Sequence, residues 1–482
     1  MTSKANRQIP YQLRAVDADD IDAIHAATLR VLSEAGAFFE DQETMDLLMS
    51  AGAVTDGDRR VRIPGELVER AIASAPKAIR LYTREGEEAL RLEPGHVYCG
   101  TGSDCPNVLD FETGERRSAT KRDIELFTRL SDALPNIDFI LNMGLASEAP
   151  THTADLHHFQ AMVTHTTKPI FFTALVDENL NHIIQLAGYI AGSQQALKDH
   201  PFLTHFAMPS PPLRHSKIAL QNLITCARHS MPVVYASGTL VGASGPMSLV
   251  GSTVSSNCDV LAGLVVHQLA NPGAPFIYGV CIAPLDMRTT TECYGAPEHF
   301  LGDVINVQTA QSYGLPTWGY AGSSDAKVLD LQAALEYCGS TLMGLLSQCN
   351  LLHDVGYLES GMTASCESIL FGDEVVEFAR RTLQRVPVDE ESLAVEAIKR
   401  LGSGGTFLME EHTVRHVRDF WYSPLIDRCH YEEWVGAGRQ TMSDRLRARA
   451  RKILSSHEPV PLDRSILKSM DEFIAAQDSE AS

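Results

Sequence analysis

A proline-led repeat constrains the fold of this chain more than any other feature. Five times a proline is followed by a short, mostly apolar run and then by a small or polar turn, and these runs start at Pro169, Pro201, Pro232, Pro275 and Pro316. The starting prolines are 32, 31, 43 and 41 residues apart, and helix-like stretches rich in Ala, Leu and Gln fill the intervals. Proline costs few hydrogen bonds at the first residue of a strand. Each repeat therefore predicts a strand followed by a helix.

Three further apolar runs, at 97–100, 137–144 and 351–355, extend the series to eight. Eight parallel strands with intervening helices form the (β/α)8, or TIM, barrel, whose buried strands are continuously apolar. The alternative is an open, doubly wound sheet. We disfavour it because the series is long and regular. In addition, the nearest dinucleotide-type turn, Gly-Thr-Gly at 100–102, has Cys105 where the third small residue belongs.

The length of the chain divides it into a barrel and two extensions. A (β/α)8 barrel needs about 250 of the 482 residues. We therefore expect an α/β protein with an N-terminal helical cap at 1–95, the barrel at 96–371 and a C-terminal helical extension at 372–482. The stretch 105–117 has the pattern of a β-hairpin. Apolar spacing predicts helices in the extensions at 21–35, 65–74, 373–383, 395–401, 412–421 and 440–455.

Charge and hydropathy argue against several partners. The net charge of −21 argues against binding to nucleic acid or to an anionic membrane. The first twenty residues lack the apolar core of a signal peptide, and no apolar run reaches the about 18 residues of a membrane span. The ten cysteines form no CxxC pair, which argues against a disulfide framework and a structural zinc site. We expect a cytoplasmic protein with reduced thiols.

Aromatic residues recur where the predicted strands end. In a (β/α)8 barrel the functional side chains come from the carboxyl ends of the strands and from the loops that follow. The aromatic candidates there are Phe206, Tyr278, Trp318, Tyr320 and Tyr357. Aromatic faces bind quaternary ammonium groups, at about 0.5–2 kcal/mol for each good contact. Any one of these rings can instead be core filling, so we expect at least two of the five to line a cation pocket.

Polar candidates lie at the same strand ends. Asp104 and Glu359 are suited to balance a cation, although each can also cap a helix or bond a loop. His205 and His353 have three possible roles, as acid–base groups, metal ligands or hydrogen-bonded core histidines. Arg288 can pair with a substrate carboxylate or with a carboxylate of the protein. The sequence assigns no catalytic residue.

Metal and thiol chemistry find little support. A catalytic metal site needs about three converging ligands, and the chain has no HExxH motif. His412 and His416 have a spacing that suits zinc, but they lie outside the repeat. Cys99 and Cys105 flank the first strand end, without a basic neighbour on the same strand face. We therefore expect no metal site and two buried, unreactive thiols.

Several long segments carry a resemblance. Three of them read SGTLVGASGPMSLVG at 237–251, YGLPTWGYAGSSDAKVLDLQAALE at 313–336 and LHDVGYLESGMTASCESILFGDE at 352–374, and three more lie at 109–139, 294–316 and 410–428. Together they resemble the trimethylamine methyltransferase family of corrinoid-dependent enzymes. The resemblance covers the chain from about residue 21 to about residue 475.

The resemblance implies a (β/α)8 barrel that passes a methyl group from a methylated amine to the cobalt of a separate corrinoid protein. The chain itself then binds no cobalamin tightly. The name-giving members carry pyrrolysine, whereas this chain has only standard residues. The resemblance therefore points to the non-pyrrolysine branch, with glycine betaine or a related betaine as substrate. A quaternary amine is already cationic and leaves as a neutral tertiary amine, so it needs no proton donor.

Two other functions stay open. One is a protein that binds a betaine-like ligand without turnover, and the other is a lyase or isomerase that shares only the barrel. Many enzymes of this kind assemble symmetrically, so we also expect a homo-oligomer. The expected partners are thus a cognate corrinoid protein, a small quaternary amine and further copies of the chain, without nucleic acid or membrane.

Overall fold

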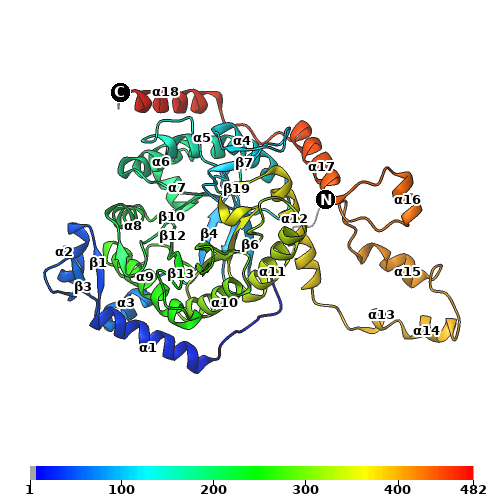
Figure 1. The fold of residues 1–482 in the computed structure, drawn as a ribbon, viewed down its shortest axis with the longest axis horizontal. Coiled ribbons are helices and arrows are strands. Elements are labelled where there is room, and N and C mark those ends of the chain that lie inside the picture. Colours follow the sequence, from blue (N-terminus) through cyan, green and yellow to red (C-terminus); the bar gives the residue numbers. More distant parts are fainter. Residues whose placement is uncertain (1–6, 481–482) are drawn as a thin grey trace.

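A curled sheet of seven parallel strands lies at the centre of the computed structural model, which describes residues 7–480 (Figure 1). Five of the strands are the proline-led runs, and two are the apolar runs at 97–100 and 351–355, so these seven predictions are confirmed. Their order in the sheet is β6 (Tyr98–Thr101), β18 (Leu351–Val355), β17 (Thr317–Tyr320), β14 (Phe276–Gly279), β12 (Val233–Ala236), β10 (Leu203–Ala207) and β9 (Ile170–Phe172).

The eighth predicted strand, at 137–144, does not form a regular ladder. Single parallel bridges join Phe139 to Gly100 of β6 and Ile140 to Ile170 of β9. The segment therefore lies between the two edge strands of the sheet, and it is not itself a strand.

A side chain takes the place of part of this ladder. The hydroxyl of Thr101 donates to the carbonyl of Leu141 at 3.0 Å and accepts the amide of Leu141 at 2.9 Å. These two bonds satisfy main-chain groups that a strand would pair with its neighbour. The apolar sequence of the segment predicts its burial correctly, but it cannot reveal this substitution.

The inner face of the curled sheet is filled by an apolar cluster that includes Trp318 and Ile277. A hairpin of β4 (Ile79–Tyr82) and β5 (Glu88–Leu92) adds apolar side chains to the same cluster. The amide of Tyr82 bonds the carbonyl of Pro201, immediately before β10, so the hairpin covers the amino ends of the strands. The interior is therefore filled from that end.

Helices surround the sheet on its outer side (Figure 1). These are α4 (Lys121–Asp132), α5 (Ala154–His165), α6 (Asp177–Ile190), α7 (Gln194–Asp199), α8 (Lys217–His229), α9 (Leu249–Ala270), α10 (Pro297–Ser312), α11 (Leu331–Ser347) and α12 (Cys366–Thr382). Of the helices in the described part of the chain, only α9 is long and apolar enough to cross a membrane. It packs against α8 and against helices of the N-terminal segment, and most of it is buried, as expected of a core helix.

The N-terminal segment is not purely helical. Its helices are α1 (Ala18–Glu34), α2 (Gln42–Ser50) and α3 (Gly65–Ser74), which include the two predicted ones. Short strands β1 (Ala37–Phe39), β2 (Val54–Thr55) and β3 (Arg60–Arg62) lie between them, in a small sheet with β11 (Arg214–His215). Strands of two or three residues are too short for an alternating pattern to be recognised, so the sequence predicts a mostly helical cap and does not reveal these strands.

The loops after the central strands carry further small sheets. The hairpin predicted at 105–117 is confirmed as antiparallel β7 and β8. The short strands of these loops are β7 (Asn107–Leu109), β8 (Arg116–Ser118), β13 (Thr239–Val241), β15 (Ile282–Asp286), β16 (Thr291–Glu292) and β19 (Thr363–Ala364).

The C-terminal segment begins with an arm, residues 384–440, that extends away from the central sheet (Figure 1). The arm contains short helices, and the chain then returns to pack α17 against α12 and α4, and α18 against α5 and α6. The four helices predicted at 373–383, 395–401, 412–421 and 440–455 correspond to α12, α14, α15 and α17. Its helices are α13 (Glu390–Leu393), α14 (Val395–Leu401), α15 (Glu411–His416), α16 (Tyr431–Gly436), α17 (Met442–Ser456) and α18 (Arg464–Glu480).

Candidate functional site

A cavity of about 400 Å³ lies at the carboxyl ends of the parallel strands, opposite the β4–β5 hairpin. Its walls come from the ends of β10, β17 and β18, from the loops after β6 and β9, and from the start of α8. The lining residues are Ser103, Asp104, Thr173, Ala174, Leu175, His205, Phe206, Ala207, Met208, Ser216, Ile218, Ala219, Asn222, Tyr294, Tyr320, His353, Asp354 and Tyr357.

Most of the side chains that the sequence singles out line this cavity. They are Phe206, Tyr320, Tyr357, Asp104, His205 and His353. They come from strands far apart in the sequence, and the curl of the sheet brings them together. Their role in binding a substrate stays a prediction.

Two of the aromatic candidates lie elsewhere. Trp318 lies in the interior cluster below the cavity, where its ring is 4.9 Å from that of Phe171 and 5.5 Å from that of Phe206. Tyr278 points to the outer side of the sheet, where its hydroxyl donates to Oδ1 of Asn257 on α9 at 2.8 Å. Alternate residues of a strand face opposite sides, and Ile277 takes the inward position. Trp318 and Tyr278 therefore do not line the cavity, whereas the other three aromatic candidates do.

Two of the charged candidates are also placed outside the cavity. Glu359 is bound to Arg116 at 2.9 Å and to the hydroxyl of Thr363 at 2.6 Å. Arg288 is 88% exposed and pairs with Asp286, at 2.7 Å. Each of these charges already has a partner within the protein, so neither is available to balance or bind a substrate group.

Asp354 is the main residue that sequence reasoning missed. Its side chain is 1% exposed, and neither carboxyl oxygen makes a hydrogen bond within the described part of the chain. Its φ is 75°, a conformation that favours glycine, and the pairing of β18 with β6 shifts register at this point. Asp354 is an acidic residue inside the apolar run LLHDV, and that anomaly is the signal that could have identified it.

The histidine next to Asp354 has a defined proton position. Nδ1 of His353 is 2.8 Å from the carbonyl oxygen of Gly319, and a carbonyl only accepts, so Nδ1 carries the proton. Burial lowers the pKa of His353 to about 3, which leaves Nε2 unprotonated. That nitrogen is 3.2 Å from Oδ1 of Asp354. Burial, together with the charges of Asp303 and Glu292, raises the pKa of Asp354 well above its usual value.

Asp104 is the second carboxyl group in the cavity. Its oxygen Oδ1 accepts from the amide of Asn142 at 2.6 Å, and the hydroxyl of Thr173 lies 3.5 Å from both oxygens. Burial raises the pKa of Asp104 to about 6, although the hydrogen bond from Asn142 opposes this rise. The cavity therefore holds two acidic groups, and none of its described lining residues is Lys or Arg.

Aromatic rings form one side of the cavity. The rings of Tyr294 and Tyr320 are 5.5 Å apart, and that of Tyr320 is 4.4 Å from His353. The hydroxyl of Tyr357 donates to the carbonyl of Ser103 and accepts its amide at 2.7 Å, so this ring is held in place. Tyr294 follows a loop strand and was not among the sequence candidates.

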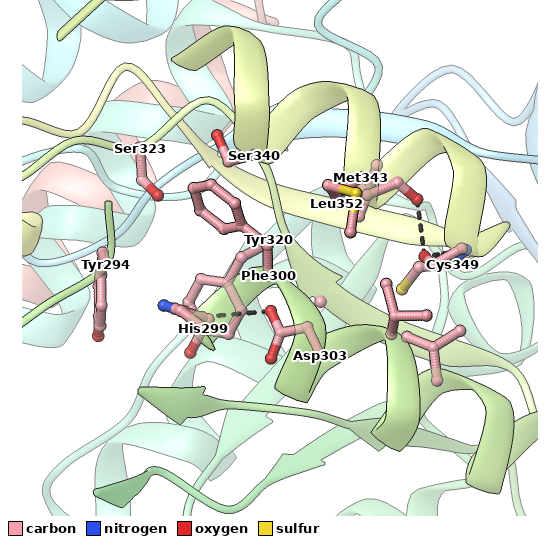
Figure 2. A pocket seen from close by; sticks show the side chains of 15 residues that line it. Tyr294, His299, Phe300, Asp303, Tyr320, Ser323, Ser340, Met343, Cys349 and Leu352 are labelled. Atoms are coloured by element: carbon pink, nitrogen blue, oxygen red, sulfur yellow. Dashed lines mark hydrogen bonds and ion pairs between the residues drawn. The ribbon is translucent and has the colours of Figure 1, made fainter. Parts of the chain in front are cut away.

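A small void of about 10 Å³ lies behind this aromatic wall. Figure 2 shows Tyr294 and Tyr320 at its edge, with an ion pair between His299 and Asp303 beside them. The two partners are 3.2 Å apart. Burial would lower the pKa of His299, but Asp303 and nearby Glu292 raise it overall. The raised pKa favours the protonated ring, which lies beside Asp303 behind the wall and does not line the larger cavity.

The cysteines near the first strand end are buried, as expected. Burial raises the pKa of the Cys99 thiol to about 11 and that of Cys105 still further above its usual value. A thiolate is the reactive form of cysteine, so neither side chain is suited to nucleophilic chemistry.

The histidine pair of the arm meets one carboxylate. The ligand atoms of Glu391, His412 and His416 lie within 4.8 Å of one another. Arg415 and His416 both pair with Glu391, at 3.1 and 3.2 Å, and Asp419 binds the other ring nitrogen of His416 at 2.7 Å. These ion pairs already account for the cluster, which lies on the arm and contributes nothing to the lining of the cavity.

Comparison with known proteins identifies the class. Residues 2–482 match the family model described as trimethylamine methyltransferase (MTTB). The chain therefore belongs to the trimethylamine methyltransferase family, and it is a methyltransferase.

Individual relatives cover the chain almost completely. It is 30% identical to trimethylamine methyltransferase MttB of Desulfitobacterium hafniense over 474 residues, which is 98% of this chain and 95% of that protein. It is also 30% identical to a glycine betaine methyltransferase of the same species over 467 residues, or 96% of each chain. The solved structure of the Methanosarcina barkeri monomethylamine methyltransferase is 12% identical, with a TM-score of 0.48, and covers 93% of this chain and 89% of that one.

Proposed function

We propose that this methyltransferase moves a methyl group from a quaternary amine to the Co(I) of a separate corrinoid protein. One observation carries the proposal: the cavity combines aromatic rings with two carboxyl groups, of which Asp354 is buried and Asp104 half-buried, and no Lys or Arg lines its described walls. A cation is the ligand that this environment stabilises, because rings attract it through their faces and a carboxylate balances its charge. One relative is named a glycine betaine methyltransferase, which supports a quaternary substrate.

The residues of the cavity would bind and orient the methyl donor. Phe206, Tyr320 and Tyr357 contact the methyl groups, and Asp354 and Asp104 supply negative charge beside them. The apolar interior below excludes water, because Trp318 and its neighbours leave the cavity open only at the carboxyl ends of the strands. The corrinoid supplies a strong nucleophile that accepts the methyl group, and the amine leaves as a neutral molecule.

The mouth of the cavity has features that suit a large partner. Leu175 and Met208 line the cavity and are 72% and 40% exposed. Met208 lies against Gly238, and Met247 and Met287, which come from two different loops, both lie against Gly242. Exposed methionines next to small residues form an adaptable apolar surface. We define this methionine rim as Leu175, Met208, Met247 and Met287, and we assign the corrinoid protein to it.

Four further proposals accompany this function. The segment that bridges β6 and β9 closes the curled sheet as a (β/α)8 barrel. The barrel spans 96–371, between an N-terminal cap at 1–95 and a C-terminal extension at 372–482. The protein is cytoplasmic and forms a homo-oligomer through its arm, whose exposed apolar side chains support this assignment.

The function is tested by mixing the purified protein with reduced free cobalamin and a panel of quaternary and tertiary amines. Methylcobalamin, followed by its absorption spectrum, is the expected product with at least one amine. If no amine on a broad panel yields methylcobalamin, the proposal is wrong. Ligand binding without methyl transfer would instead identify a binding protein.

A further inference from the structure

We propose that the substrate of this cavity carries a net positive charge and no carboxylate. Simple or hydroxylated alkyl trimethylammonium ions would be accepted, and zwitterionic betaines would be disfavoured. The inference rests on the proposed function, because it names the substrate class of the same site. It also departs from the glycine betaine that the family resemblance implies.

The carboxyl groups of the cavity walls can carry only negative charge, and a bound cation favours their ionised form. Asp354 is buried there and Asp104 is half-buried, and the described lining residues include no Lys or Arg. The carboxylate of a betaine lies within a few ångströms of its ammonium group. A bound betaine would therefore bring a further negative charge into the enclosed space that already holds Asp104 and Asp354. Like charges in a poorly solvated site repel one another strongly. A cation without a carboxylate avoids this repulsion.

Basic groups in the loops and helices after the strands pair with carboxylates of the protein, among them Arg288, which the sequence offered for a substrate carboxylate. Arg288 pairs with Asp286 on the surface, and Arg116 pairs with Glu359. His299 pairs with Asp303 behind the aromatic wall. Each of these side chains is already paired with a carboxylate of the protein, and none of them lines the cavity.

The two histidines of the cavity do not replace an arginine. Burial lowers the pKa of His205 to about 4 and that of His353 to about 3, so both rings are neutral at pH 7. His353 uses its one proton on the carbonyl of Gly319. Neither ring nitrogen of His205 has a hydrogen bond of normal length among the described residues, although the backbone of Phe172 is near enough to oppose the fall in the pKa. His205 thus offers one uncharged donor and one acceptor, which suits a hydroxyl group better than a carboxylate.

A helix end also reaches the cavity, and its positive dipole requires consideration. Ser216 and Ala219 at the start of α8 are lining residues. The hydroxyl of Ser216 accepts the amide of Ala219 at 3.4 Å, and Glu40 accepts the amide of Lys217 at 3.4 Å. A side chain of the protein already supplies the negative charge that this helix terminus favours. The amino end of α8 therefore offers no free binding position for the carboxylate of a ligand.

Binding of matched ligands tests the inference directly. Tetramethylammonium, choline and glycine betaine share the methylated head, and only the last carries a carboxylate. Titration calorimetry at pH 7.5 is expected to show dissociation constants at least tenfold lower for the two cations than for glycine betaine. The methyl ester of glycine betaine keeps the betaine shape but loses the negative charge, and it is expected to bind like choline.

Variants identify the source of the preference. Asp354→Asn and Asp104→Asn keep the side-chain size but cannot become negatively charged. Each is expected to weaken choline binding at least tenfold and to reduce the difference in dissociation constant between choline and glycine betaine. Thermal melting shows whether each variant folds. If one of them does not, the other still tests the inference. Asp286→Asn removes a carboxylate on the surface and is expected to leave the preference unchanged. Equal or tighter binding of glycine betaine by the natural protein would overturn the inference.

A methyl-transfer assay with the same ligands separates this inference from the proposed function. Tight binding of the cations without methylcobalamin would support the charge preference and refute methyl transfer. Efficient transfer from glycine betaine, with weaker binding of choline, would support methyl transfer and refute the charge preference. Failure of every ligand to bind would refute both.

Discussion

Nε2 of His353 lies 3.2 Å from Oδ1 of Asp354 in the wall of the cavity, where both side chains are buried. Because the carbonyl of Gly319 holds the ring proton on Nδ1, Nε2 presents a lone pair to this oxygen. A carboxylate beside that lone pair would be repelled, whereas a carboxylic acid can donate its proton to it. The contact therefore stabilises the neutral form of Asp354 in the free protein. A bound cation would favour the ionised form.

Affinity for a cation should consequently fall at low pH. Burial raises the pKa of Asp104 to about 6, so this group is protonated below pH 6 and ionised above it. The ionised form attracts a cation, so affinity is lost as the pH falls through 6. Protonation of this one group predicts a dissociation constant about tenfold higher at pH 5 than at pH 7. Calorimetry with tetramethylammonium at both values measures this change.

The control for this prediction is Asp104→Asn. The variant lacks the group that titrates near pH 6, so the part of the pH dependence that Asp104 contributes should disappear. An unchanged profile in the variant would show that another group is responsible. Calorimetry in buffers of different ionisation enthalpy should also show that cation binding releases protons from the natural protein.

The aromatic wall gives a second prediction. Replacing Tyr320 by Leu removes a ring face from the cavity and should weaken cation binding by about 0.5–2 kcal/mol, or about 2- to 30-fold. Tyr278→Phe is the matched control, because its ring points away from the cavity and only its hydroxyl bond to Asn257 is lost. The control should keep its affinity and lose about 1 kcal/mol of stability. Equal affinities in the two variants would exclude Tyr320 from binding.

A substitution of Trp318 tests whether this residue stabilises the interior or binds the cation. Its ring packs against Phe139, Phe171 and Phe206 in the interior cluster, and its indole nitrogen has no partner among the described residues. Trp318→Leu should therefore lower the melting temperature by leaving a void, and it should change cation affinity less than Tyr320→Leu does. A large loss of affinity without a loss of stability would return Trp318 to the binding site.

The sequence predicts the strands well, because each proline-led run is continuously apolar, and it predicts side-chain direction poorly. Tyr278 and Trp318 both lie near the ends of their strands, yet one faces outward and the other lies a layer below the cavity. A shift of one residue in a strand boundary reverses this direction. Asp354 was passed over because its burial and its missing partners arise only when β6, β17 and β18 are brought together.

The arm gives a prediction about assembly. Its helices have at most seven residues, too few for stability in isolation. Leu408, Met409 and Phe420 on the arm are 79%, 89% and 73% exposed. Such side chains are normally covered, and we expect a second copy of the chain to cover them. Leu408→Asp with Met409→Asp should shift the protein to a smaller species in light scattering, while an exposed pair outside the arm, Leu331→Asp with Leu335→Asp, should not.

The methionine rim gives the prediction that separates partner docking from chemistry. Met247 and Met287 are 68% and 62% exposed, and neither lines the cavity. Met247→Glu with Met287→Glu should leave the dissociation constant of the amine and the transfer to free cobalamin unchanged. With the cognate corrinoid protein as acceptor, the KM for that protein should rise at least tenfold, because two charges now oppose an apolar contact. An equal loss with both acceptors would place these methionines in the methyl-transfer site, and an unchanged KM would move the docking surface away from the rim.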